Sequence, residues 1–416
     1  MGETMDFEAI TRLGDQLQGR FRAANYDELA FCELASDALA GHDDTFVWSP
    51  SAIAGYLAST TVAQDPAFEF SNLPLILYRC PSFYIELLVW TSGTTAIHEH
   101  GFSGAFKVVA GSSLHTRYGF SAERRINHRL WLGRVECLGV EYLQQGAIRA
   151  IQPGDKGLCH SLFHLDHPSA TLVIRTQGIH SYLPQRTLAA PCFAYSEPEM
   201  DRDPRIDMLR RLLDTALDID RDGFVALLTR DIPALDFPTL FVLALDRRGL
   251  LGAGKEAGAF FAAVARHHGE PLAGHLRDAI NEALRVDSLR AARRSTRDEG
   301  LRYFLALLMN LRHRHQVLAM LGERFPDVDP GKTCASLLAR LCDQRQEASR
   351  LLARLAASSG VGEYRLGARV AGALPDELDI AARASRLEAA LGGEGDDPLS
   401  RRLAAIDELA PLFRPG

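Results

Sequence analysis

The chain has 416 residues and a formal net charge of -7, with 47% hydrophobic and 24% charged residues. This length supports a sizeable core and two domains, and this composition excludes a largely disordered protein. The acidic balance gives no electrostatic reason to expect nucleic acid or an anionic membrane as a partner.

The N-terminal third begins with a helical pattern. Its first residues lack the basic-then-apolar order of a signal peptide, and no run reaches about 18 apolar residues, so we expect a cytoplasmic protein with no membrane partner. Apolar residues at spacings of three and four predict one helix from about residue 5 and a second over residues 26–39. A further short helix is predicted to begin at Pro50. Such helices commonly cover one side of a small barrel.

From Leu73 the chain changes to short β-rich runs separated by Gly, Pro, Ser and Asp. The predicted strands cover residues 75–78, 83–90, 105–109, 114–118, 135–140, 147–151 and 170–175. Short strands at this spacing, closed by turns, are typical of an antiparallel barrel or sandwich.

After Asp203 the pattern is that of one helix after another. The predicted helices cover residues 206–217, 224–228, 239–245, 257–267, 276–294, 301–311, 316–325, 334–341, 348–356, 377–391 and 400–413. Pro and acidic residues between 185 and 202 mark a boundary. We therefore predict an α+β protein with two domains, an N-terminal antiparallel β-barrel with flanking helices in residues 1–190 and an all-α domain in residues 200–416.

A His-x-His pair lies between two of the predicted strands. Side chains two apart on a strand point to the same face, so His98 and His100 can present both imidazoles to one metal ion while Glu99 points away. Gly93 and Gly111 bracket the pair, which suits a turn before it and a tight hairpin after it. The alternative is a chance pair of solvated strand residues.

This segment resembles a known motif. Gly93-x4-His98-x-His100, followed by a strand and Gly111, is similar to the first motif of the cupin superfamily, and residues 87–108 resemble its cysteine dioxygenase (thiol dioxygenase) branch. The resemblance covers about residues 70–180. Many cupins add a Glu ligand shortly after the second His, but residues 103–106 contain no carboxylate. The thiol dioxygenase branch also lacks it and uses three histidines.

The third histidine is expected in a second motif, within residues 154–175. His160 is the first choice, because the branch has a Leu-His near a strand start, and His164 is the reserve. The resemblance implies a mononuclear non-heme iron(II) oxygenase that uses O2 on a small polar or thiol substrate. Three neutral imidazoles also fit zinc, nickel or manganese, so iron comes from the resemblance alone.

Two arginines are candidates for substrate handling. The resemblance implies an Arg on an early strand that binds a substrate carboxylate, and Arg79 is the nearest match, with an ordinary surface Arg as the alternative. The family's Ser-x-His-x-Tyr pattern appears here as Thr171-x-Val173-x-Arg175, so the relay is absent and cysteine becomes a doubtful substrate. Arg175 stands where the Tyr is expected and could bring a cation to an anionic substrate.

Other interpretations remain open. In a metal-dependent sensor, a fourth protein ligand, His164 or His167, could fill the open coordination position of the metal. A non-oxidative cupin isomerase or lyase would use the same ligands with a different metal. The large helical domain suits a homodimer contact, a cover for the barrel mouth, or a surface that holds a peptide substrate.

The sequence also predicts the surroundings of two residues near the motifs, His115 and Cys159. We expect His115 to occupy a solvated hairpin position, with contact to a metal ligand as the alternative. Seven cysteines without a CxxC pair indicate neither a disulfide framework nor a structural zinc cluster. Cys159 adjoins His160, but strand alternation points it away.

Overall fold

A computed structural model describes residues 7–42, 46–65, 70–91, 93–154, 157–177, 185–196, 203–252, 254–341, 370, 380–392 and 398–413. The chain forms two compact units. The first comprises Met1–Gly119, Val140–Leu188 and Ala194–Glu197, and the second comprises Phe120–Gly139, Ala189–Phe193 and Pro198–Gly416. Residues 120–139, which we predicted within the N-terminal domain, are therefore grouped with the helical part.

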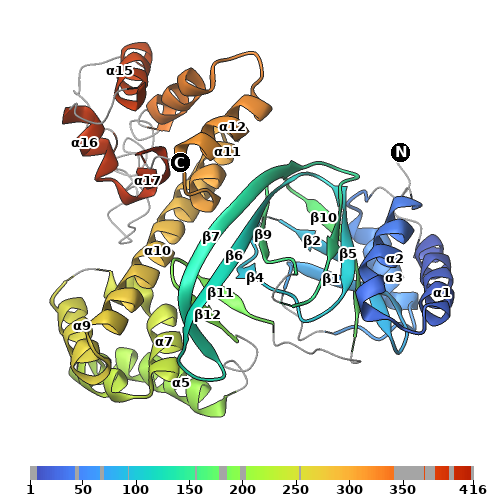
Figure 1. Ribbon diagram of the computed structural model, residues 1–416, viewed down its shortest axis with the longest axis horizontal. Helices are drawn as coiled ribbons and strands as arrows, with labels where there is room; N and C mark the ends of the chain where they lie inside the picture. Colours follow the sequence, from blue (N-terminus) through green and yellow to red (C-terminus); the bar gives the residue numbers. More distant parts are fainter. Residues whose placement is uncertain are drawn as a thin grey trace. The chain divides into compact units, whose positions relative to one another are not determined.

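Three helices cover one face of the first unit's sheet (Figure 1). They are α1 (Phe7–Ala23), α2 (Glu28–Ala40) and α3 (Pro50–Ser59). The α2 helix begins where the Asp27 carboxylate accepts a hydrogen bond from the Leu29 amide, and α3 begins with Pro50 after a Ser49 cap. The buried residues of α1 recur every three or four positions, as its amphipathic pattern predicts.

The covered sheet has five antiparallel strands. In spatial order they are β1 (Leu73–Arg79), β2 (Phe83–Trp90), β10 (Ser169–Thr176), β5 (Gly104–Ala110) and β8 (Ile148–Ile151). Each corresponds to a predicted strand, because both of its faces are buried or half-buried and its apolar residues form a short continuous run.

Alternation along these strands separates two apolar clusters. Residues such as Leu87 and Leu172 pack against the helices, whereas their neighbours Leu88 and Val173 point to the opposite face. The second cluster, which also includes Trp90, lies on the interior side of the sheet. This alternation directs every second residue of β2 and β10 toward the cavity described below.

The second sheet closes on itself. Its order is β3 (Gly93–Thr94), β9 (His160–His164), β4 (Ile97–His98), β11 (Thr187–Ala189), β12 (Phe193–Tyr195), β7 (Leu130–Leu143) and β6 (Ser113–Arg125), and β9 also pairs with β6. The predicted antiparallel barrel with flanking helices is confirmed. Both β6 and β7 are longer than predicted. In β6 the added residues 121–125 are all exposed and show no apolar alternation.

From Pro204 onward the described residues contain helices and no strand. The elements are α5 (Pro204–Ile219), α6 (Arg221–Ala226), a π-helical turn (Leu227–Asp231), a 3-10 turn (Ile232–Ala234), α7 (Phe237–Asp246), α8 (Arg248–Leu251), α9 (Lys255–His268), α10 (Glu270–Ser295), α11 (Glu299–Asn310), α12 (Arg314–Arg324), a helix over residues 330–341, α15 (Ile380–Gly392), α16 (Pro398–Ala404), a 3-10 turn (Asp407–Leu409) and α17 (Ala410–Phe413). The helix predicted over 348–356 lies outside the described residues, as does the start of the one predicted over 377–391. None of the helices described here is long and apolar enough to cross a membrane.

Candidate metal centre

Three histidines meet on the interior side of the barrel. His98 ends β4 and His160 begins β9, and the antiparallel register places the two directly opposite each other. β4 ends before His100, but the Glu99 amide still donates to the Arg186 carbonyl at 2.8 Å, so the backbone stays paired through the motif. The His98, His100 and His160 side chains are all buried.

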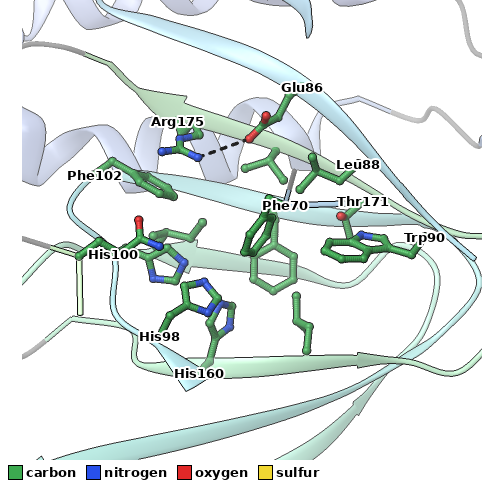
Figure 2. A pocket seen from close by; sticks show the side chains of 15 residues that line it. Phe70, Glu86, Leu88, Trp90, His98, His100, Phe102, His160, Thr171 and Arg175 are labelled. Atoms are coloured by element: carbon green, nitrogen blue, oxygen red, sulfur yellow. Dashed lines mark ion pairs between the residues drawn. The ribbon is translucent and has the colours of Figure 1, made fainter. Parts of the chain in front are cut away.

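The three imidazoles are close enough to share one ion. One candidate ligand nitrogen from each lies within 4.8 Å of the others, and no other group of three or more potential ligands occurs among the described residues. Figure 2 shows the three rings side by side on one wall of a cavity. Between His98 and His100, the Glu99 carboxylate is bonded to Arg186 and does not line the cavity.

Hydrogen bonds to the far ring nitrogens determine which nitrogen each ring can offer. Nδ1 of His98 lies 2.8 Å from the Ala96 carbonyl, and Nδ1 of His100 lies 2.9 Å from the Leu158 carbonyl. A carbonyl oxygen can only accept, so both Nδ1 atoms carry the proton. In both rings Nε2 therefore keeps its lone pair for a metal.

His160 is oriented by a longer relay. Its Nδ1 lies 2.8 Å from Nε2 of His115, and Nδ1 of His115 lies 2.6 Å from the Glu141 carboxylate, which also accepts from Arg149 at 2.8 Å. Because the carboxylate accepts, His115 donates through Nδ1 and accepts through Nε2, and His160 donates through Nδ1. Nε2 of His160 is thus the nitrogen available for a metal.

The expectation that His115 is solvated is wrong. Its side chain is fully buried, because the register of β6 and β9 places it opposite Leu162, on the interior face. The alternative, contact with a predicted ligand, is the arrangement observed. Its partner Glu141 was not singled out from sequence, since it lies on β7 among residues of mixed character.

Burial sets the protonation of the site. It lowers the pKa of His98 to about 4 and the pKa values of His100 and His160 well below their usual range. The Arg149 hydrogen bond is the main cause that lowers the pKa of Glu141 to about 2, and burial lowers the pKa of His115. At neutral pH the site therefore contains neutral imidazoles beside an ionised carboxylate, the state in which imidazole binds metals.

The cavity next to the histidines has a volume of about 620 Å³, including the part open to solvent. Besides the three histidines it is lined by Phe70, Glu86, Leu88, Trp90, Phe102, Phe106, Ile151, Leu162, Thr171, Val173, Arg175 and Gln185. Most of these side chains are apolar or aromatic, as in typical sites for small organic ligands.

Two charged side chains interrupt the apolar lining. Glu86 on β2 is 2% exposed, and its Oε1 lies 3.7 Å from Nη1 of Arg175 on β10. The Arg175 guanidinium lies over the Phe102 ring, 3.8 Å from the centroid (Figure 2). Arg175 is one of the residues predicted from the sequence, whereas Glu86 is not. The available signal was a lone carboxylate in the otherwise apolar strand Phe83–Trp90.

Glu86 should make stability depend on pH. Burial is the main cause that raises its pKa from the ordinary value of 4.5 to about 7, against the influence of Arg175. A raised folded-state pKa means that folding favours the protonated carboxyl, so stability is lost as pH rises from about 4.5 through about 7. We expect Glu86→Gln to remove a loss on the order of 3 kcal/mol. Urea unfolding at several pH values, compared with the surface variant Glu136→Gln, tests this; parallel profiles for Glu86→Gln and wild type contradict it.

The remaining candidates lie away from the three-histidine group. Arg79 is exposed at the end of β1, over the Tyr84 ring, and is not among the residues that line the cavity. His164 is buried and stacked on Trp90, with ring centroids 4.3 Å apart, and His167 is exposed. Cys159 does not line the cavity, and burial raises the pKa of its thiol to about 12, which disfavours the reactive thiolate.

Comparison with known proteins leaves the family open. No family model matches the chain, and no curated protein matches it. Among solved structures, hydroquinone 1,2-dioxygenase from Sphingomonas sp. TTNP3, with 4-hydroxybenzoate bound, is similar at a TM-score of 0.20 and 11% identity, over 34% of this chain and 87% of that one. DMSP lyase DddQ from Ruegeria pomeroyi DSS-3 is similar at a TM-score of 0.22 and 12% identity, over 42% and 93% of the two chains. Likeness at this level does not assign the chain to a family.

Proposed function

We propose that the protein is a mononuclear non-heme iron(II) oxygenase whose metal is held by Nε2 of His98, His100 and His160. The observation that carries this proposal is the set of three buried, neutral imidazoles on the wall of an apolar cavity, each with its Nδ1 already hydrogen-bonded. Three protein ligands with substrate space beside them are typical of a catalytic metal site rather than a structural one.

The donor set fits a divalent metal. Neutral imidazoles leave the charge of the ion uncompensated, and the group contains no fourth ligand from the described residues. His164, the reserve ligand, is not in this group, and its ring stacks on Trp90 with centroids 4.3 Å apart. An open coordination face toward the cavity is what an oxygenase needs and what a closed sensor site lacks.

The choice of iron and O2 rests on the resemblance of residues 87–108 to the thiol dioxygenase branch. When bound, iron(II) in such a site supplies positions at which an organic substrate and O2 react side by side. The aromatic side chains make the cavity lining largely apolar, and the hydrogen bonds at Nδ1 hold the ligand rings in one tautomer. A zinc or manganese lyase is the second candidate, because the same three imidazoles suit those metals.

Elemental analysis and O2 uptake test the proposal. We expect protein purified under anaerobic conditions to contain about one iron per chain and to consume O2 with at least one member of a panel of thiols, amides and short peptides. His98→Ala should lose both properties. The exposed α9 residue His267 provides the matched control, and His267→Ala should keep both.

Two other results would contradict the proposal. Stoichiometric zinc or manganese with no O2 consumption under any condition overturns the oxygenase and favours the lyase or isomerase. Metal content that is unchanged in His98→Ala overturns the metal site itself.

A further inference from the structure

We infer that the Glu86–Arg175 pair is the recognition element of the cavity and that it selects a substrate with a carboxamide, a neutral polar group, over one with a carboxylate. This inference rests on the proposed use of the cavity as a substrate site. It replaces the expectation from sequence that Arg175 offers an uncompensated cation to an anion.

The pair is built to face the cavity. Glu86 and Arg175 lie on adjacent antiparallel strands, where Arg175 is opposite Tyr84 and Glu86 is opposite Val173, so the two side chains are diagonal neighbours on one face. Both line the cavity, and Phe102 covers one face of the guanidinium. The orientation of the Arg175 plane is therefore fixed by stacking.

Its geometry differs from that of a structural ion pair in the same chain. In the helical unit, Glu282 accepts from Arg285 at 2.9 and 2.8 Å and pairs with Arg312 at 2.6 Å. Glu86 and Arg175 approach only to 3.7 Å, longer than a hydrogen bond. A polar group of a ligand can therefore bridge these two side chains from the cavity side.

The charges of Glu86 and Arg175 decide which polar group of a ligand binds at the pair. A carboxylate that approaches Arg175 also approaches the buried Glu86 carboxylate, and like charges repel strongly in a poorly solvated site. A carboxamide has an acceptor beside a donor: its carbonyl oxygen accepts from Arg175, and its N–H donates to Glu86. Both members of the pair gain a hydrogen bond to a charged group, and no further charge is buried.

The pair is also close to the proposed metal site. The Phe102 ring that stacks on Arg175 lies 5.0 Å from the His100 ring, centroid to centroid, and the Arg175 charge contributes to the lowered pKa values of His98 and His100. A small substrate can therefore place its amide at the pair while its body occupies the apolar part of the cavity, beside the histidines.

Benzamide and benzoate, which share a ring and differ in the polar group, test the inference. Isothermal titration at about pH 8, where most Glu86 is ionised, should show benzamide binding at least about tenfold more tightly than benzoate to the metal-loaded wild-type protein. In Glu86→Gln the repulsion is gone, so we expect the ratio to reverse in favour of benzoate. Arg175→Gln should weaken both ligands by about tenfold, and Glu136→Gln at the surface should change neither.

Repeating the titrations after removal of the metal with a chelator separates carboxylate binding at the pair from carboxylate binding to the metal. Benzoate binding as tightly as benzamide to the metal-free wild-type protein, or a ratio unchanged in Glu86→Gln, overturns the inference. The titrations of the metal-free protein need neither iron nor O2. A failure of the oxygenase proposal and a failure of this inference therefore give different results.

Discussion

Replacing His160 with alanine is expected to reduce metal from about one ion per chain to below about a tenth, with a loss of affinity of more than about a hundredfold. The reason is that, among the described residues, His160 belongs to the one group of three candidate ligands that could hold an ion. Two remaining imidazoles make a much weaker chelate. Inductively coupled plasma mass spectrometry after gel filtration measures the ratio of metal to protein.

The control for this prediction is the other buried histidine of the same strand. His164→Ala should keep its metal, because His164 is not in the group of three histidines whose candidate ligand atoms lie within 4.8 Å of one another, and its ring stacks on Trp90. His98→Ala should repeat the loss seen for His160→Ala. Circular dichroism identifies any variant that fails to fold. Metal retained in a folded His160→Ala and lost from a folded His164→Ala makes His164 the third ligand.

Replacing His115 with phenylalanine is expected to weaken metal affinity by about 10- to 100-fold without removing a ligand. Phenylalanine fills similar space but offers no acceptor to Nδ1 of His160, so the His160 ring loses the bond that fixes its tautomer and orientation. Glu141→Gln should have a smaller effect, because the amide oxygen still accepts from His115. Competition with a chromophoric chelator measures the affinities.

A purely structural role for His115 predicts a different result. In that case His115→Phe lowers stability but leaves the chelator competition and the visible spectrum of the cobalt(II)-substituted protein unchanged. Glu136→Gln, at an exposed position of the same strand as Glu141, serves as the matched control and should leave both measurements at their wild-type values.

Much of the fold could be predicted, because the spacing of apolar residues along the chain indicates whether a segment is a helix or a strand. The run from Phe83 to Trp90 is apolar enough to indicate a buried strand, and the spacing of Ile10, Leu13 and Leu17 indicates a helix with one buried face. The end of β6 over residues 121–125 could not be predicted in this way, because these residues are all exposed and carry no alternation.

The candidate site was only partly accessible from sequence. His98 and His100 are two residues apart, so their common face follows from strand geometry alone. His115 and His160 are 45 residues apart, and their contact depends on the pairing of β6 with β9. Similarly, no local pattern indicates that Glu86 faces Arg175, because the two meet only where β2 and β10 are neighbours.

By itself, the sequence determined most helices and the longer strands, the change from strands to helices after Pro204, and the placing of His98 and His100 on one face. These features depend on residues within a few positions of one another. Only the tertiary structure decided that β9 closes the barrel by pairing with both β4 and β6, that His115 is buried against His160, and that Glu86 lies beside Arg175. Strand order and register arise from long-range pairing, which brings together side chains whose separation along the chain carries no periodic signal.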